Sequence, residues 1–141
     1  MTYNAAFFGT HEAYFLALKE LKGEDFALNT MRHVMERNLG AAYRKMGFVV
    51  GNSHDFARVV GERDESVGLH VEFPVVTDEK IVYQFHTDPF PNLKGHVTPE
   101  KLDATYMKFK VSFLLGSEWS YKTTQHIWND APYTEHIIEK K

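Results

Sequence analysis

The order of hydrophobic patterns along this sequence predicts an α+β fold. Apolar residues three and four positions apart fill the first third of the chain. Alternating segments follow, and another helical stretch precedes a final alternating pair. Helices and strands grouped in this way are typical of antiparallel sheets. We therefore expect an antiparallel sheet packed against N-terminal helices and one central helix, with a closing C-terminal hairpin.

Two helices are predicted before residue 48. The first has Thr10 as its cap, continues through EAYFLALKEL and stops at Gly23, and the second ends at Gly47. Each has one apolar face with helical spacing. These faces are Tyr14, Leu18 and Leu21 in the first helix, and Leu28, Met31, Met35, Leu39, Ala42 and Met46 in the second.

Strands are predicted next. DFARVV is interpreted as a short strand, while VGLHVEFPVV and IVYQFHT alternate and flank a TDEK turn. A third helix begins at Thr98 and Pro99 and ends at Gly116. YKTTQHIW and YTEHII form the final hairpin. The buried face of the third helix is predicted to hold Leu102, Tyr106, Phe109 and Phe113.

Composition limits the class of protein. The 141 residues fit a single domain, residues 1–141, and a net charge of −3 without a basic stripe argues against nucleic acid as a partner. No apolar run reaches the roughly 20 residues of a membrane span, so no membrane partner is expected. The start lacks a targeting pattern, which predicts a cytoplasmic location. The absence of cysteine excludes disulfides, thiolate metal sites and a cysteine nucleophile.

Histidines on the predicted strands suggest a metal site. His70 and Glu72 share one strand face, and His86 lies on a neighbouring strand, so two nitrogens and one carboxylate converge if the strand registers align. His126 is a further candidate ligand for a divalent metal. The alternative is an ordinary solvated sheet face, where polar residues alternate with core residues.

The C-terminal hairpin raises a question of register. A four-residue loop sets His126 opposite Glu135, where the carboxylate could orient the imidazole as a base. A five-residue loop sets His126 opposite His136, where the pair could bind a ligand or metal. The sequence leaves both registers open, together with the alternative that these side chains only meet water.

A loop that follows a strand carries further candidates. His86 and Asp88 in FHTDPFPN form a base and a carboxylate that could activate water, although Asp88 before a proline is also a common turn residue. Tyr106 and Trp128 offer aromatic surface with a polar atom, which suits a small-molecule pocket or the edge of the core. Phe90, between two prolines, is expected to anchor in the core.

Three segments together resemble a known family. GEDFALNTMRHVMERNLGAAYRKMGF, FHTDPFPNL and TTQHIWNDAPYTEHII are similar to the long helix, the Cys-Pro segment and the closing hairpin of the L-2-amino-thiazoline-4-carboxylic acid hydrolase-like family. That family is related in its C-terminal half to vinyl-reductase-type small-molecule-binding domains. The resemblance implies a cavity between helices and sheet and, in the hydrolase branch, opening of a cyclic amidine-like ring by water.

The chain departs from the family where the family has thiols. Asp88 precedes Pro89 where the family places cysteine before proline, and Tyr133 or Thr134 stands where the hairpin cysteine would be. Cysteine-dependent catalysis and cysteine-held zinc therefore do not carry over. The remaining acid-base candidates are His86, Asp88, His126 and Glu135, with His70, Glu72, Tyr106, Trp128 and His136 as ligand-binding candidates.

Four functional hypotheses follow from these patterns. The first is a domain that binds, and in the hydrolase case cleaves, a small nitrogen-containing or carboxylated compound. The second is a sensor or carrier that has the pocket without the chemistry. The third is a metal-dependent hydrolase using His70, His86 and His126 or His136. The fourth is a dimerisation module, in which a homodimer buries an apolar sheet edge or helix face.

Overall fold

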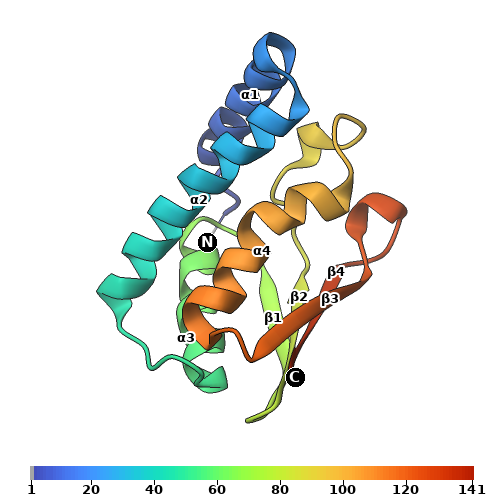
Figure 1. Cartoon of the computed structure of the whole chain (residues 1–141). Helices are drawn as coiled ribbons and strands as arrows, with labels where there is room; N and C mark the ends of the chain where they lie inside the picture. Colours follow the sequence, from blue (N-terminus) through green and yellow to red (C-terminus); the bar gives the residue numbers. More distant parts are fainter. Residues whose placement is uncertain (1) are drawn as a thin grey trace.

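The computed structural model describes residues 2–141 and has the predicted α+β fold, with four helices and one antiparallel sheet of four strands (Figure 1). Within this part of the chain, no helix is both long and apolar enough to cross a bilayer. The elements are α1 (Ala5–Lys22), α2 (Glu24–Met46), α3 (Ser53–Ser66), β1 (Val71–Val76), β2 (Lys80–Phe85), α4 (Pro99–Leu115), β3 (Trp119–Gln125) and β4 (Thr134–Lys140), with short 3₁₀ turns at Pro91–Leu93 and Ile127–Asn129.

The sheet has the strand order β1-β2-β4-β3, and each neighbouring pair is antiparallel. One face packs on the helices: α3 contacts β1 and β2, and α4 lies between α2 and β3 (Figure 1). Successive side chains along each strand point to opposite sides of the sheet, so the sheet has a buried inner face toward the helices and an outer face away from them. The inner face of β2 and β4 consists of Ile81, Tyr83, Phe85, Thr134, His136 and Ile138, all buried.

The DFARVV segment is a helix, so its interpretation as a strand was wrong. It lies within α3, whose first turn is capped by the Asn52 side chain accepting a hydrogen bond from Asp55 N–H. The buried residues of α3 include Phe56, Val59, Val60 and Asp64, which follow the spacing of a helix. A six-residue window holds too few apolar positions to separate this spacing from a short strand.

The first helix starts earlier than predicted. The Asn4 side chain caps it by accepting from Phe7 N–H, whereas Thr10 lies inside the helix and donates to the carbonyl of Ala6. The predicted apolar face was also wrong at two positions, because Tyr14 is 68% and Leu21 76% exposed. The buried face of α1 holds Phe8, Glu12 and Phe15 instead.

The other predicted boundaries fall close to those observed. α2 and α4 end at Gly47 and Gly116, both with positive φ, and the Thr98 side chain caps α4 by accepting from Lys101 N–H. Phe90 is buried, as expected. β1 begins at Val71 rather than Val67, because residues 67 and 68 form the turn that ends α3.

The C-terminal hairpin forms, but with neither of the two registers considered. Gln125 pairs with Glu135 and Thr123 with His136 across β3 and β4, with an irregularity between these pairs. The connection is longer than four or five residues because it contains the 3₁₀ turn Ile127–Asn129. His126 therefore lies beyond the end of β3 and caps that turn, since its Nδ1 accepts a hydrogen bond from Trp128 N–H.

Candidate functional site

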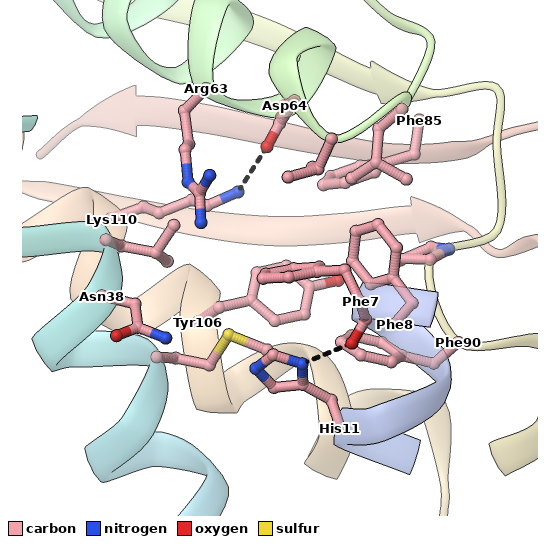
Figure 2. A pocket seen from close by; sticks show the side chains of 15 residues that line it. Phe7, Phe8, His11, Asn38, Arg63, Asp64, Phe85, Phe90, Tyr106 and Lys110 are labelled. Atoms are coloured by element: carbon pink, nitrogen blue, oxygen red, sulfur yellow. Dashed lines mark hydrogen bonds and ion pairs between the residues drawn. The ribbon is translucent and has the colours of Figure 1, made fainter. Parts of the chain in front are cut away.

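A cavity of about 50 Å³ lies between the helices and the inner face of the sheet (Figure 2). We call it the helix–sheet cavity. About 10–15 Å³ of such space is enough for one water, so it has room for several waters or a small ligand. It is lined by Phe7, Phe8, His11, Met35, Asn38, Leu39, Arg63, Asp64, Val67, Leu69, Phe85, Pro89, Phe90, Tyr106 and Lys110.

Two oppositely charged side chains are buried at one wall of this cavity. Lys110 of α4 is 3% exposed and its Nζ lies 3.7 Å from Oδ1 of Asp64 on α3 (Figure 2). The Tyr83 hydroxyl of β2 donates to Asp64 Oδ2 and accepts from Lys110 Nζ at 3.0 Å. Three elements are thus joined by one polar group of three side chains inside the core.

Burial shifts the titration of both charged partners. Loss of hydration raises the pKa of the Asp64 carboxyl, although Lys110 and the Tyr83 hydroxyl act in the opposite direction. Loss of hydration also lowers the pKa of the Lys110 amine, against the attraction of Asp64. Shifted ionisable groups beside a cavity are typical of functional sites, although buried structural pairs show the same shifts.

Arg63, next to Asp64 on α3, adds a second positive charge to the cavity wall. In Figure 2 its side chain extends toward the space between α3 and the helices opposite. The guanidinium carbon lies 5.6 Å from the centre of the Phe7 ring, and within residues 2–141 no carboxylate forms an ion pair with it. The cavity therefore presents one cation that is paired with a carboxylate, Lys110, and one, Arg63, that has no carboxylate ion pair among the described residues.

A second polar group lies nearer the beginning of α4, around Asp103. His126 Nε2 is 3.1 Å and His136 Nε2 is 4.0 Å from Asp103 Oδ2, while the Tyr106 hydroxyl donates to Oδ1 at 2.9 Å. The two histidines do approach one carboxylate, but it comes from the helix and not from the hairpin. His136 is fully buried, and its pKa is lowered to about 4, mainly by loss of hydration; Asp103 opposes this shift, and Lys110 and His126 add to it.

His126 is held in one tautomer by its neighbours. Its Nδ1 accepts from Trp128 N–H at 3.0 Å, so in the neutral ring the proton resides on Nε2, which faces Asp103. The Trp128 indole N–H donates to Asp88 Oδ2 at 2.8 Å, and Asp88 Oδ1 accepts from Phe90 N–H. Partial burial raises the pKa of Asp88. Asp88, Trp128, His126 and Asp103 therefore form one connected set.

This set lines a hollow of about 10 Å³ next to the helix–sheet cavity. Phe85, Pro89, Phe90 and Tyr106 line both spaces and so form a shared wall. On its other side, His126 and Asp103 also line an open groove of about 460 Å³ over β3 and the start of α4. The His126 side chain is 11% exposed, so solvent in the groove can reach it.

The four predicted acid-base candidates separate into two places. Asp88 and His126 lie together on the helix side of the sheet, whereas His86 and Glu135 lie on its outer face. There Gln84 joins the latter pair, because its amide donates to Glu135 Oε1 at 2.9 Å and its carbonyl lies 3.2 Å from His86 Nε2. The hydrogen bonds from Thr124 and Gln84 lower the pKa of Glu135.

The predicted ligand-binding residues also divide. Tyr106 lines the helix–sheet cavity, Trp128 lines the small hollow, and His136 lies in the core beside Asp103. His70 and Glu72 lie with His86 at the edge of the outer face, where the three side chains converge as the sequence suggested. His126 belongs to the Asp103 group and is not part of this convergence.

Sequence reasoning missed four charged residues: Asp64, Asp103, Lys110 and Arg63. A signal was present in α4, where Asp103 and Lys110 are seven residues apart and Tyr106 lies between them on the same face. Charged residues placed within an apolar helical stripe indicate a buried polar group. Asp64 and Arg63 had no comparable signal because their helix had been taken for a strand.

No protein-family model and no curated protein matches this chain.

Proposed function

We propose that this protein binds a small compound carrying a carboxylate in the helix–sheet cavity. The observation that carries the proposal is Arg63, a guanidinium without a carboxylate partner among the described residues, at the wall of a mainly apolar cavity. Such a cation gains from an anion that enters the same mainly apolar space, where an ion pair is stronger than in bulk water. The resemblance to the hydrolase-like family, whose substrate class is carboxylated, agrees with this proposal.

The remaining walls favour a flat or cyclic ligand body. Phe7, Phe8, Phe85, Phe90 and Tyr106 supply aromatic surface. Pockets for small molecules are commonly apolar with a few polar groups that fix orientation. His11 is held in place by its Nδ1 contact of 2.8 Å with the Phe7 carbonyl, and Asn38 adds a neutral amide. These groups suit a nitrogen-containing ring beside the carboxylate.

Lys110 supports the same ligand charge without leaving its partner. Its ammonium is already matched by Asp64 and Tyr83, and it lies 5.0 to 5.3 Å from the ring centres of Tyr106, Tyr83 and Phe85. A ligand carboxylate near Arg63 therefore need not break the buried pair. The two cations together outnumber the single carboxylate of the cavity wall.

Titration with benzoate and with benzamide, its uncharged counterpart, tests the proposal. In amide NMR spectra of the ¹⁵N-labelled protein, benzoate should shift the signals of residues around the cavity. The affinity for benzamide, measured from the same shifts, should be at least tenfold lower. Arg63→Gln should weaken benzoate binding by at least tenfold. Arg37→Gln is the matched control, because Arg37 is exposed on α2, and this variant should bind benzoate as tightly as the natural protein does. Equal binding of both probes, or an equal effect of both variants, would contradict the proposal.

A second candidate function is hydrolysis of a C–N bond in such a compound. It is favoured by the connected set of Asp88, Trp128, His126 and Asp103, which adjoins the cavity and is reached by solvent from the groove. In this arrangement His126 presents a proton on Nε2, so it would act as a donor, and the carboxylates of Asp103 and Asp88 would act as bases.

The hydrolysis is tested with L-2-amino-thiazoline-4-carboxylate. Water adds to the amidine carbon, the ring C–N bond breaks, and the ring nitrogen takes up both protons of the water to become an amine, so the opened product is heavier than the substrate by one water. Mass spectrometry should detect this product with the natural protein and at least a hundredfold less with His126→Gln. His33→Gln, at an exposed histidine on α2, is the control and should form as much product as the natural protein. Binding of the compound without any turnover would instead favour the sensor or carrier hypothesis.

A further inference from the structure

His70, Glu72 and His86 form a compact cluster at the edge of the sheet, which we call the rim cluster. One ligand atom from each lies within 4.8 Å of the other two. Glu72 Oε2 is 2.7 Å from His86 Nε2, and Glu72 Oε1 is 3.7 Å from His70 Nε2. No other group of three such side chains in the described part of the chain meets this spacing.

The backbone fixes the positions from which the three side chains extend. His86 N–H donates to the carbonyl of His70 at 2.8 Å, and His70 N–H donates to the Thr87 hydroxyl at 3.0 Å. Glu72 is paired with Gln84 in the β1–β2 ladder, so it lies on the same outer face as His86. The centres of the two imidazole rings are 5.2 Å apart, and the ring planes are inclined to each other by 65°. The cluster therefore rests on two paired strands.

The spacing suits a tetrahedral metal ion. Zinc binds histidine nitrogen and carboxylate oxygen at about 2.0–2.2 Å, which places neighbouring ligand atoms about 3.3 Å apart. The two observed separations, 2.7 and 3.7 Å, lie on either side of that value. All three side chains are exposed enough to adjust, at 66% for His70, 50% for Glu72 and 27% for His86. Small rotations of these side chains would therefore be sufficient to bring the three ligand atoms to the spacing of a tetrahedral zinc site.

The donor set also selects the class of metal. Two imidazoles and one carboxylate suit zinc and similar transition metals, whereas magnesium and calcium prefer oxygen ligands throughout. Three protein ligands leave a fourth position for water. Since His70 and Glu72 face solvent, that position would be open rather than closed by the protein.

Neighbouring side chains give His86 an ordered environment. The Gln84 carbonyl oxygen lies 3.2 Å from His86 Nε2, and the Gln84 amide is anchored on Glu135. The Tyr133 ring lies 4.9 Å from the His86 ring, on its other flank. Gln84 contacts the nitrogen that would bind the ion, so its carbonyl would give up this contact to the metal, whereas the Tyr133 ring can keep the imidazole in position.

We propose that the rim cluster binds one Zn²⁺ ion, separately from the small-molecule site. The rim cluster is on the outer face of the sheet, whereas the helix–sheet cavity is on the inner face, so the two sites do not share residues. The proposal therefore does not depend on the ligand proposed for the cavity. It differs from a zinc hydrolase centred on His126, because His126 is engaged with Asp103.

The test is a titration of tag-free protein with Zn²⁺ in competition with a chromogenic chelator, followed by isothermal calorimetry. We expect one equivalent to bind, and no measurable binding of Mg²⁺ under the same conditions. A variant with His70→Ala and His86→Ala should bind Zn²⁺ at least tenfold more weakly. The matched control has His33→Ala and His54→Ala, two exposed histidines on α2 and α3, and should bind as the natural protein does.

Two spectroscopic measurements locate the ion. In histidine-selective NMR, Zn²⁺ should shift the ring nitrogens of His70 and His86 but leave those of the buried His136 unchanged. Co²⁺ in place of Zn²⁺ should give the visible absorption bands of a tetrahedral ion, and Glu72→Gln should weaken them. Unchanged binding in the His70 and His86 variant, or equal loss in the control variant, would overturn the proposal.

Discussion

Lys110 Nζ and Asp64 Oδ1 lie 3.7 Å apart in the protein interior, with the Tyr83 hydroxyl hydrogen-bonded to both residues. Both charged side chains are at most 5% exposed. A buried pair of this kind gains little net free energy over a well-packed apolar pair, because both ions lose their hydration. Removing only one partner, however, leaves a buried charge without compensation.

The first prediction concerns this pair. Lys110→Met or Asp64→Leu alone should lower the free energy of unfolding by about 3–5 kcal/mol, because each leaves the other charge unpaired. The variant with both substitutions should lose clearly less than the sum of the single losses. Urea denaturation of the four proteins measures this coupling. If the losses simply add, the two side chains do not compensate each other.

The second prediction concerns pH and His136. The fold lowers the pKa of this imidazole from 6.5 to about 4, mainly through burial, so the folded protein favours the neutral ring. Its contribution to stability is therefore complete above pH 6.5 and is lost as the pH falls from 6.5 to about 4. The full shift corresponds to about 3 kcal/mol.

The comparison of natural protein with His136→Gln isolates that contribution. Urea denaturation at pH 7 and pH 4.5 should show a larger loss of stability in the natural protein than in the variant, by about 2 kcal/mol. Asp103, Lys110 and His126, the charged and titratable groups on the helix side of His136, are present in both proteins, so the two proteins differ in the imidazole alone. Equal losses in the two proteins would mean that His136 is not held neutral by the fold.

The third prediction concerns the hydrogen bond between the Trp128 indole and Asp88. Trp128→Phe keeps an aromatic ring but removes the N–H donor, so the free energy of unfolding should fall by about 1.5–3 kcal/mol. The same change should raise the pKa of Asp88 further, since that hydrogen bond holds it down. Trp119→Phe, at another buried tryptophan, is the control and should not change the Asp88 titration measured by NMR.

The fourth prediction concerns Gly68, in the turn between α3 and β1. Its φ is +83°, and a Cβ atom there would lie 2.0 Å from the backbone oxygen of Thr2. Gly68→Ala should therefore cost the left-handed strain of about 1–2 kcal/mol and a further 1–3 kcal/mol from the clash. Gly95→Ala, at a similar φ of +86° with open space around it, should cost the strain alone. Thermal denaturation compares the two.

The sequence determined several features because their signals are local. The boundaries of α2 and α4 were predictable from apolar spacing, a Thr98 cap and terminal glycines, which act within one or two helical turns. The convergence of His70, Glu72 and His86 was predicted only on the condition that the strand registers align, and the β1–β2 register meets that condition. The α+β class followed from the grouping of these elements.

The α3 helix and the exposed face of α1 were not predictable, because short apolar windows fit more than one period and because burial depends on which neighbour covers a face. The groups around Asp64 and Asp103 were decided only by tertiary packing. Asp64 meets Lys110 and Asp103 meets His126 across long stretches of sequence, and the long hairpin loop moves His126 out of the sheet register. Local patterns specify elements, whereas contacts between distant side chains depend on how those elements pack.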